Sequence, residues 1–163
     1  MKHQSVYADF YDASALLRIH TDEVGSQVVR EYVSRRPPGY TTPFCFYEAM
    51  NGLKAKWKYK NQLTKEQYLL AAQRLTAWFE ATSRHIKDLD FSDLLVFSRT
   101  REIADRHGLD LSDAFQIMSV KHGFFSVLVG DSATLLVTCD KELFAAARAE
   151  GVRCWCALSD APP

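Results

Sequence analysis

The chain has 163 residues, 47% of them hydrophobic and 25% charged, values that exclude a disordered or membrane-embedded chain and allow a core without disulfides or a structural metal. Its twenty basic and twenty acidic residues cancel, which excludes a chain-wide charge field as the basis of nucleic-acid binding; any such surface is expected to be a local patch. No apolar run approaches the ~20 residues of a membrane span and the polar start does not resemble a secretory signal, so we expect one domain over residues 1–163, in the cytoplasm and without membrane contact.

The first part of the chain predicts a strand followed by two helices. SVYADFY, residues 5–11, predicts a short strand, and helical patterns follow over residues 13–20 and 22–36. RPPG at residues 36–39 then breaks the chain. The second helix is expected to carry Val24, Val28, Tyr32 and Val33 on one apolar face.

Three further helices are predicted before residue 110. A brief extended stretch leads into the first of them, and Thr64 begins the second through a capping box with Gln67. HIKDLDF, residues 85–91, predicts a short strand. Ser92 is then expected to cap a helix that ends at Gly108, a residue suited to the left-handed turn after a helix.

The last part of the chain predicts two strands with a helix between them. Ser112 is expected to cap one more helix, and residues 123–133 fit either an extension of that helix or a strand. TLLVTC, residues 134–139, predicts a strand covered on both faces, followed by a helix over 141–151 and a final strand over 152–158. Strands separated by helices imply a parallel sheet, so we expect an α/β fold: a three-layer α/β/α sandwich with a central parallel sheet.

Four acidic residues flank apolar segments of this predicted fold. Asp12 follows the first strand and Asp140 follows the strand over 134–139, and ligands of an open parallel sheet bind beyond such strand ends. Asp113 and Glu48 lie in the first turns of their helices. Singly they have ordinary explanations: helix caps for Asp12 and Asp140, a helix-dipole partner for Asp113 and an exposed helix residue for Glu48.

As a group, the four acids indicate a metal site, because the predicted fold allows all of them to meet at one edge of the sheet. Two carboxylates ~5 Å apart repel by roughly 3 kcal/mol at an effective dielectric constant of about 20, so the group needs a counter-charge. Oxygen ligands suit magnesium or manganese, which usually contact a substrate phosphate as well. The pattern therefore favours phosphoryl-transfer chemistry.

The segments that hold the acids are YDASALL (11–17), YEAMNGL (47–53), LSDAFQ (111–116) and LLVTCDKELFAAARAEGV (135–152). In order and approximate spacing they resemble the four acidic motifs of PIN-domain nucleases, most closely the VapC-type toxins of bacterial toxin-antitoxin pairs. The resemblance spans nearly the whole chain. Residues in excess of a minimal member are expected in 54–66 and 118–134.

The resemblance implies a metal-dependent endoribonuclease, with Asp12, Glu48, Asp113 and Asp140 holding one or two magnesium or manganese ions and Ser14 and Thr138 as supporting hydroxyls. Asp12 and Asp140 are expected to be direct ligands, with Asp113 completing the shell and Glu48 acting through water. Asp110, one turn before Asp113, is expected to be a surface turn residue. The resemblance further implies an RNA substrate, a small antitoxin protein that blocks the acidic pocket, and a homodimer.

A basic segment is the candidate RNA contact. LKAKWKYK, residues 53–60, can contact phosphates and stack a base, and the alternative is a solvated helix end whose lysines suit the helix dipole. Trp57 is expected to belong to the core. The candidate RNA-binding side chains are Lys54, Lys56, Lys58, Lys60 and Arg18.

Three other functions stay open at this point. One is a PIN-like binding or scaffold module that does not cleave RNA, and another is a housekeeping RNA-processing nuclease. The third is a receiver-like or phosphatase domain, which would need a second acid beside Asp12 and a lysine late in the sheet; the residues around Asp12 do not supply that pair. The presence of all four acids favours an enzyme over a scaffold.

Overall fold

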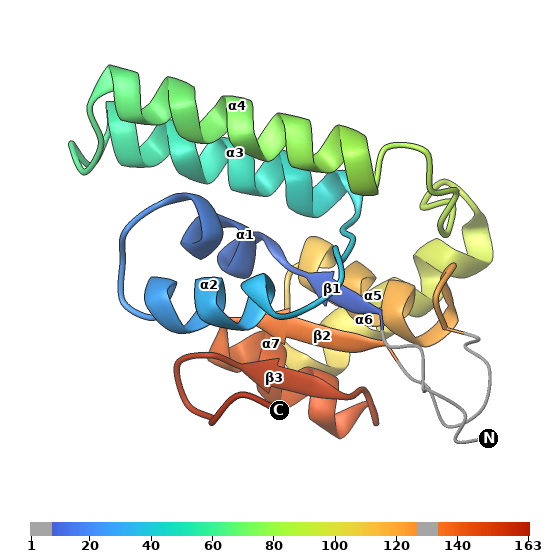
Figure 1. Ribbon diagram of the computed structural model, residues 1–163. Helices are drawn as coiled ribbons and strands as arrows, with labels where there is room; N and C mark the ends of the chain where they lie inside the picture. Colours follow the sequence, from blue (N-terminus) through green and yellow to red (C-terminus); the bar gives the residue numbers. More distant parts are fainter. Residues whose placement is uncertain (1–7, 127–133) are drawn as a thin grey trace.

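The structure is a computed structural model, which describes residues 8–126 and 134–163 (Figure 1). Within these residues the chain forms three strands and seven helices. In chain order they are β1 (Asp9–Tyr11), α1 (Ala13–His20), α2 (Ser26–Ser34), α3 (Pro43–Lys58), α4 (Lys65–Thr82), α5 (Leu94–His107), α6 (Leu111–His122), β2 (Leu135–Thr138), α7 (Lys141–Ala149) and β3 (Cys154–Cys156).

The strands form a parallel sheet in the order β1-β2-β3, with Tyr11 paired to Val137 and Val137 to Trp155. On one side of the sheet, helix α1 packs on β1 and β2 and also contacts α2, α3 and α4. On the other side, α7 packs on β2 and β3 and contacts α6, and α6 packs against α5. The sheet therefore lies between two groups of helices (Figure 1), which confirms the predicted α/β/α sandwich.

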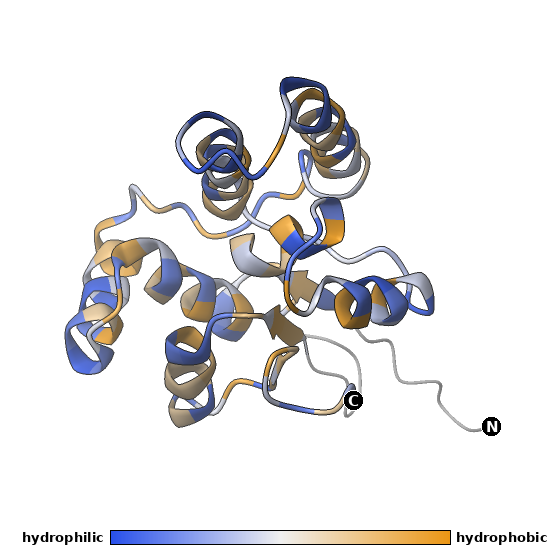
Figure 2. Ribbon diagram, turned by 90° about the vertical axis from the view of Figure 1, so that its left-hand side faces the viewer, coloured by the Kyte–Doolittle hydropathy of each residue, from blue (hydrophilic) through white to orange (hydrophobic). Residues whose placement is uncertain are grey.

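The core is centred on the sheet. Every residue of β1 and β2 is buried. Figure 2 shows the strands as hydrophobic segments in the middle of the molecule, surrounded by helices that carry both hydrophobic and hydrophilic residues. Among the helices of the described residues, none has both the length and the apolar character that crossing a membrane requires.

Several local predictions are confirmed. Thr64 and Gln67 form the expected capping box at the start of α4, with each side chain accepting a hydrogen bond from the other residue's backbone N–H. Gly108 ends α5 in the left-handed conformation, at φ 67°. These signals were reliable because the interacting groups are only a few residues apart in the chain.

The strand predicted over 85–91 is wrong, because those residues form turns and irregular structure. The predicted first strand, 5–11, is described only from residue 8, and β1 starts at Asp9; most of the segment 123–133 also lies outside the described residues. The helix caps differ by one or two positions from those expected: Asp93 caps α5 in place of Ser92, and Asp110 caps α6 in place of Ser112.

The apolar face predicted for α2 is partly wrong. Val24 precedes the helix and is 81% exposed, and Val28 lies on its outer side. Helix α2 instead buries Ser26, Val29 and Tyr32, and the Tyr32 ring packs against Trp155 with centroids 4.6 Å apart. The helix starts four residues later than predicted, at Ser26, after Gly25 adopts the left-handed conformation.

Tyr40 continues the sheet beyond β1. The Tyr11 N–H donates to the Tyr40 carbonyl, and the Tyr40 N–H donates to the Asp9 carbonyl, both at 2.9 Å. Gly39 allows this close approach, since a Cβ at that position would lie 2.2 Å from Tyr11 Cε2 and 2.4 Å from the Asp9 carbonyl oxygen.

We expect Gly39→Ala to lower the free energy of unfolding by about 2–3 kcal/mol, because the methyl group must push the chain away from β1. Gly108→Ala is the control: a Cβ there meets no atom within 4 Å, so only the left-handed backbone is strained, at a cost of about 1 kcal/mol. Urea unfolding of both variants measures the difference. Equal losses would contradict the steric explanation.

Glu150, just after α7, joins three helices. Its carboxylate accepts hydrogen bonds from His107 Nε2 at 2.8 Å and Lys121 Nζ at 2.9 Å, and from Arg106 Nη1. The Glu150 side chain is only 8% exposed. The hydrogen bond from His107, followed by that from Lys121, lowers the pKa of Glu150 to about 2.

Because the folded pKa of Glu150 lies below its ordinary value, its ionised form stabilises the fold above about pH 4.5, and this contribution is lost as the pH falls towards 2. We therefore expect Glu150→Gln to lower the free energy of unfolding by about 1–3 kcal/mol at pH 7. Arg106 contributes little to this loss, because its side chain is largely exposed and water screens its charge. Denaturant unfolding at pH 7 and pH 3 measures the pH dependence. A wild-type advantage that does not shrink at pH 3 would contradict this interpretation.

Candidate active site

Two acids lie at the carboxyl ends of neighbouring strands. Asp12 directly follows β1, Asp140 follows β2 by one residue, and the Asp12 N–H donates to the Val137 carbonyl at 3.2 Å. Because β1 and β2 are parallel and adjacent, their ends place both acids at the same edge of the sheet. The structure thus brings Asp12 and Asp140 together, as the sequence predicted.

Asp12 is 2% exposed, and its carboxylate is held by surrounding donors. It accepts from the Ala15 N–H at 2.8 Å, from Ser14 Oγ at 2.8 Å and from Thr138 Oγ1 at 2.8 Å. Burial raises the pKa of Asp12 to about 6, although these hydrogen bonds oppose the rise. These three hydrogen-bond donors make burial of the Asp12 carboxylate possible, and they fix the position of the carboxylate.

The two supporting hydroxyls link the loops after β1 and β2. Thr138 Oγ1, while donating to Asp12, accepts from the Asp140 N–H at 2.9 Å. Ser14 Oγ likewise accepts from the Cys139 N–H at 2.8 Å. One hydroxyl therefore connects both strand-end acids, and the second holds the loop between them.

Asp113 and Glu48 come from helices α6 and α3. Asp110 caps α6 by accepting from the Asp113 N–H at 2.9 Å. Ser112 Oγ lies 3.0 Å from Asp110 Oδ1 and 3.1 Å from Glu48 Oε2, which links α6 to α3. The Asp113 carboxylate accepts from Gln116 Nε2 at 3.1 Å.

Neighbouring negative charges act on both Asp113 and Glu48. Burial first, and then neighbouring negative charges, raise the pKa of Asp113 to about 8. Glu48 is exposed as a residue, as its ordinary explanation predicts, yet partial burial of its carboxyl group raises its pKa, and the charges of Asp110 and Asp140 add to the effect. The charges that act on Asp113 are those of Asp110, Glu48, Asp12 and Asp140.

In residues 8–126 and 134–163, no three histidine, cysteine, aspartate or glutamate side chains form a ready-made metal cage. The donor set nevertheless fits a hard divalent cation, because it consists of carboxylate oxygens whose raised pKa values such a cation would offset. The acids are grouped within electrostatic range without a closed ligand shell.

In a comparison with protein families, the PIN domain model matches residues 10–149. The chain belongs to the PIN-domain family. Comparison with curated proteins gave no match. PIN domains are generally nucleases and are usually dependent on divalent metals, so the family match and the grouping of the acids agree.

The ordinary explanations of the acids also hold in part for this PIN domain. Asp12 caps α1, and Asp140 caps α7 by accepting from the Glu142 and Leu143 N–H groups. Asp110 is exposed, as a surface residue should be, yet its charge reaches Asp113 and Glu48. Capping explains the positions of Asp12, Asp140 and Asp110, but not why they lie close to Asp113 and Glu48 at one edge of the sheet.

The structure divides the predicted RNA-binding residues into two groups. Lys54, Lys58 and Lys60 are exposed at the end of α3. Lys56 and Arg18 are instead mostly buried and converge on Glu23, at 3.3 and 3.7 Å. Trp57 is half-buried rather than fully in the core, and its ring stacks on Tyr68 with centroids 4.8 Å apart.

Two polar neighbours of the acids were missed by the sequence analysis, Ser112 and Gln116. Gln116 lies three residues after Asp113, a spacing at which side chains on a helix meet, so its position carried a usable signal. Ser112 was interpreted as a helix cap, and its contact with Glu48 depends on tertiary structure.

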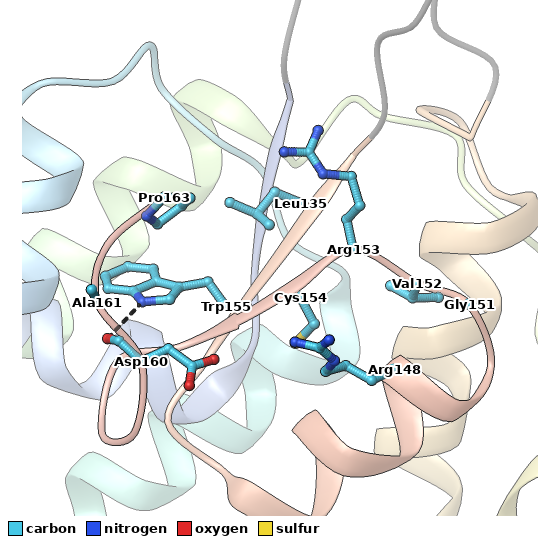
Figure 3. A pocket seen from close by; sticks show the side chains of 10 residues that line it. All are labelled: Leu135, Arg148, Gly151, Val152, Arg153, Cys154, Trp155, Asp160, Ala161 and Pro163. Atoms are coloured by element: carbon cyan, nitrogen blue, oxygen red, sulfur yellow. Dashed lines mark hydrogen bonds between the residues drawn. The ribbon is translucent and has the colours of Figure 1, made fainter.

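A cavity of about 440 Å³ lies beside β3 and the end of α7, and none of the four acids lines it (Figure 3). Arg148, Arg153 and Asp160 border it together with Trp155, whose indole N–H donates to the Asp160 carbonyl at 3.2 Å. This cavity adjoins the strand starts, at the end of the sheet opposite Asp12 and Asp140.

Proposed function

We propose that this PIN domain is a metal-dependent endoribonuclease that cleaves RNA phosphodiester bonds. The observation that carries the proposal is the hydrogen-bonded unit of Asp12, Thr138 and Asp140, with Asp113 close enough for the other acids to raise its pKa. An acidic site of this kind repels a phosphodiester unless a cation is present, so metal dependence is part of the proposal.

Asp12, Asp113 and Asp140 would hold magnesium or manganese, with Glu48 as an outer member of the set. When bound, such a cation neutralises charge on the phosphate and supplies an activated water for its hydrolysis. Ser14 and Thr138 keep the Asp12 carboxylate fixed and ionised by donating to it. The exposed Lys54, Lys58 and Lys60 would contact the RNA backbone. 

The test is cleavage of a labelled RNA by the purified protein. We expect endonucleolytic products with magnesium or manganese and none after chelation by EDTA, with activity restored by added manganese. Manganese titration calorimetry on the same sample measures binding directly. Cleavage that persists in EDTA would overturn metal dependence, and a protein that neither binds manganese nor cleaves RNA would instead be a scaffold module.

We further propose that the enzyme is the toxin of a toxin-antitoxin pair, acting in the cytoplasm as a homodimer and inhibited by a small antitoxin protein. The support is the VapC-like order and spacing of the acidic segments in the sequence. Induction in a bacterial host is expected to arrest growth, and co-expression of a short neighbouring reading frame is expected to relieve the arrest. Unimpaired growth, with RNA cleavage retained in vitro, would favour a housekeeping nuclease.

A further inference from the structure

The three acids proposed as direct ligands differ in how firmly the protein holds them. Asp12 accepts hydrogen bonds from Ser14, Thr138 and the Ala15 backbone, and Asp140 accepts from two backbone N–H groups of α7. Asp113, in contrast, accepts one hydrogen bond within the described residues, from Gln116 Nε2 to Oδ1 at 3.1 Å. A carboxylate held by a single donor depends on that donor for its orientation.

Gln116 is an unusual side chain for its place in α6. It is 1% exposed, among neighbours on the helix that are all buried, from Ala114 to Val120. Its amide Nε2 reaches Asp113, but its Oε1 is buried without a hydrogen-bond partner in the part of the chain that the structure describes. A buried acceptor without a partner destabilises a protein, so a purely structural role would favour an apolar residue here.

The orientation of the amide follows from the charge of its neighbour. A cation-bound Asp113 carboxylate would be ionised and could only accept hydrogen bonds, which matches an amide that turns its Nε2 towards Asp113 and its Oε1 away, into the core. The unpartnered Oε1 is therefore the cost of presenting a donor to Asp113. Oδ2 of Asp113 receives no hydrogen bond from the described residues and stays available as a ligand.

We propose that Gln116 is a positioning residue, which orients the Asp113 carboxylate for binding a divalent cation through the hydrogen bond from Nε2 to Oδ1. The proposal rests on the proposed metal-dependent function. Partners that orient a ligand in this way typically contribute a factor of about 10–100 to metal affinity or activity. Gln116 itself contacts neither the cation nor the RNA.

The test compares Gln116→Met with the wild type. Methionine has a similar length and volume but neither donates to Asp113 nor leaves an unpartnered oxygen. By calorimetry we expect the dissociation constant for manganese to rise about tenfold. The thermal midpoint of the metal-free variant is expected to equal or exceed that of the wild type. At subsaturating manganese kcat should fall, while KM for RNA should stay unchanged.

Ser119→Ala is the matched control, because Ser119 is fully buried one turn further along α6 and its Oγ also lacks a partner among the described residues. It should leave manganese affinity unchanged. Gln116→Asn is a second variant for the case that methionine does not pack in the core. The asparagine side chain is one methylene shorter than glutamine, so its amide cannot reach Asp113.

The outcomes separate the two proposals. If the wild type does not bind manganese, the metal-dependent function fails and the role of Gln116 fails with it. If the wild type binds manganese and the Gln116 variants bind it equally well, only the positioning role is overturned. A lower thermal midpoint with unchanged affinity would likewise show a structural role alone, and so would equal weakening by Ser119→Ala.

Discussion

Asp12→Asn is expected to reduce RNA cleavage at saturating manganese by about 10³-fold or more. Asparagine removes the charge that would bind the cation, and such a cation contributes several kcal/mol to stabilising the transition state, or about 10³ in rate for 4 kcal/mol. Single-turnover cleavage of a labelled RNA, with enzyme in excess, measures the effect without interference from product release.

The fold should survive this substitution. Asparagine is as good a helix cap as aspartate, so the hydrogen bond from the Ala15 N–H can be kept, and the Ser14 and Thr138 hydroxyls can rotate to face the amide. Burial opposes ionisation of Asp12, so a neutral side chain removes that cost. We therefore expect the thermal midpoint of the metal-free variant to be no lower than that of the wild type.

Asp93→Asn is the matched control. Asp93 caps α5 through the Leu95 and Val96 N–H groups, as Asp12 caps α1, but it is exposed and belongs to none of the acidic segments. Its substitution should leave the cleavage rate unchanged. Full activity in Asp12→Asn, or in the corresponding Asp140→Asn, would show that the strand-end acids are not the catalytic group.

The sequence predicted the strand-end acids well because their positions depend on local rules. An apolar segment followed by an acidic residue and a helix places the acid at the carboxyl end of a strand, and parallel pairing then places Asp12 beside Asp140. The fold class followed from the alternation of strands and helices. The metal-binding roles of these residues stay predictions, because they rest on the resemblance and on electrostatics.

The prediction of a strand at 85–91 was wrong because this segment forms hydrogen bonds with a side chain instead of with a neighbouring strand. Asp88 Oδ1 accepts from the Leu89 N–H and from the Phe124 N–H, so the segment is tied to the end of α6 through a side chain rather than through a strand ladder. Gly123 makes this contact possible, since a Cβ there would lie 2.1 Å from Asp88 Oδ1. A partner 36 residues away in the chain leaves no local signal.

The candidate RNA-binding residues show again that contacts between distant residues leave no local signal in the sequence. Arg18 and Lys56 belong to α1 and α3, and only the packing of these helices brings both to Glu23. Sequence spacing could place lysines on a helix but could not show which of them are already paired. Lys54, Lys58 and Lys60 remain the candidates that solvent, and hence RNA, can reach.

The largest expected loss of stability concerns another buried acid, Asp9 in β1. Asp9 is 3% exposed and forms a two-pronged pair with Arg36, whose Nε and Nη2 lie 3.0 Å from its two oxygens. Asp9 and its hydrogen bonds raise the pKa of Arg36 above its usual range, which keeps the guanidinium charged. We expect Arg36→Met to cost about 3–5 kcal/mol, because it leaves a buried carboxylate without its counter-charge.

The reverse substitution should cost less, and this asymmetry is the sharper test. Asp9→Asn leaves Arg36 with a side chain 27% exposed to water and with its guanidinium 5.5 Å from the Tyr32 ring centre, so a loss of about 1–2 kcal/mol is expected. In the double variant the uncompensated charge is gone, and stability should return to near that of Asp9→Asn. Arg35→Met, at an exposed neighbour, should change stability by less than about 0.5 kcal/mol. If Arg36→Met proves no more harmful than Arg35→Met in urea unfolding, or if Asp9→Asn fails to rescue it, then packing rather than charge pairing holds the edge of the sheet.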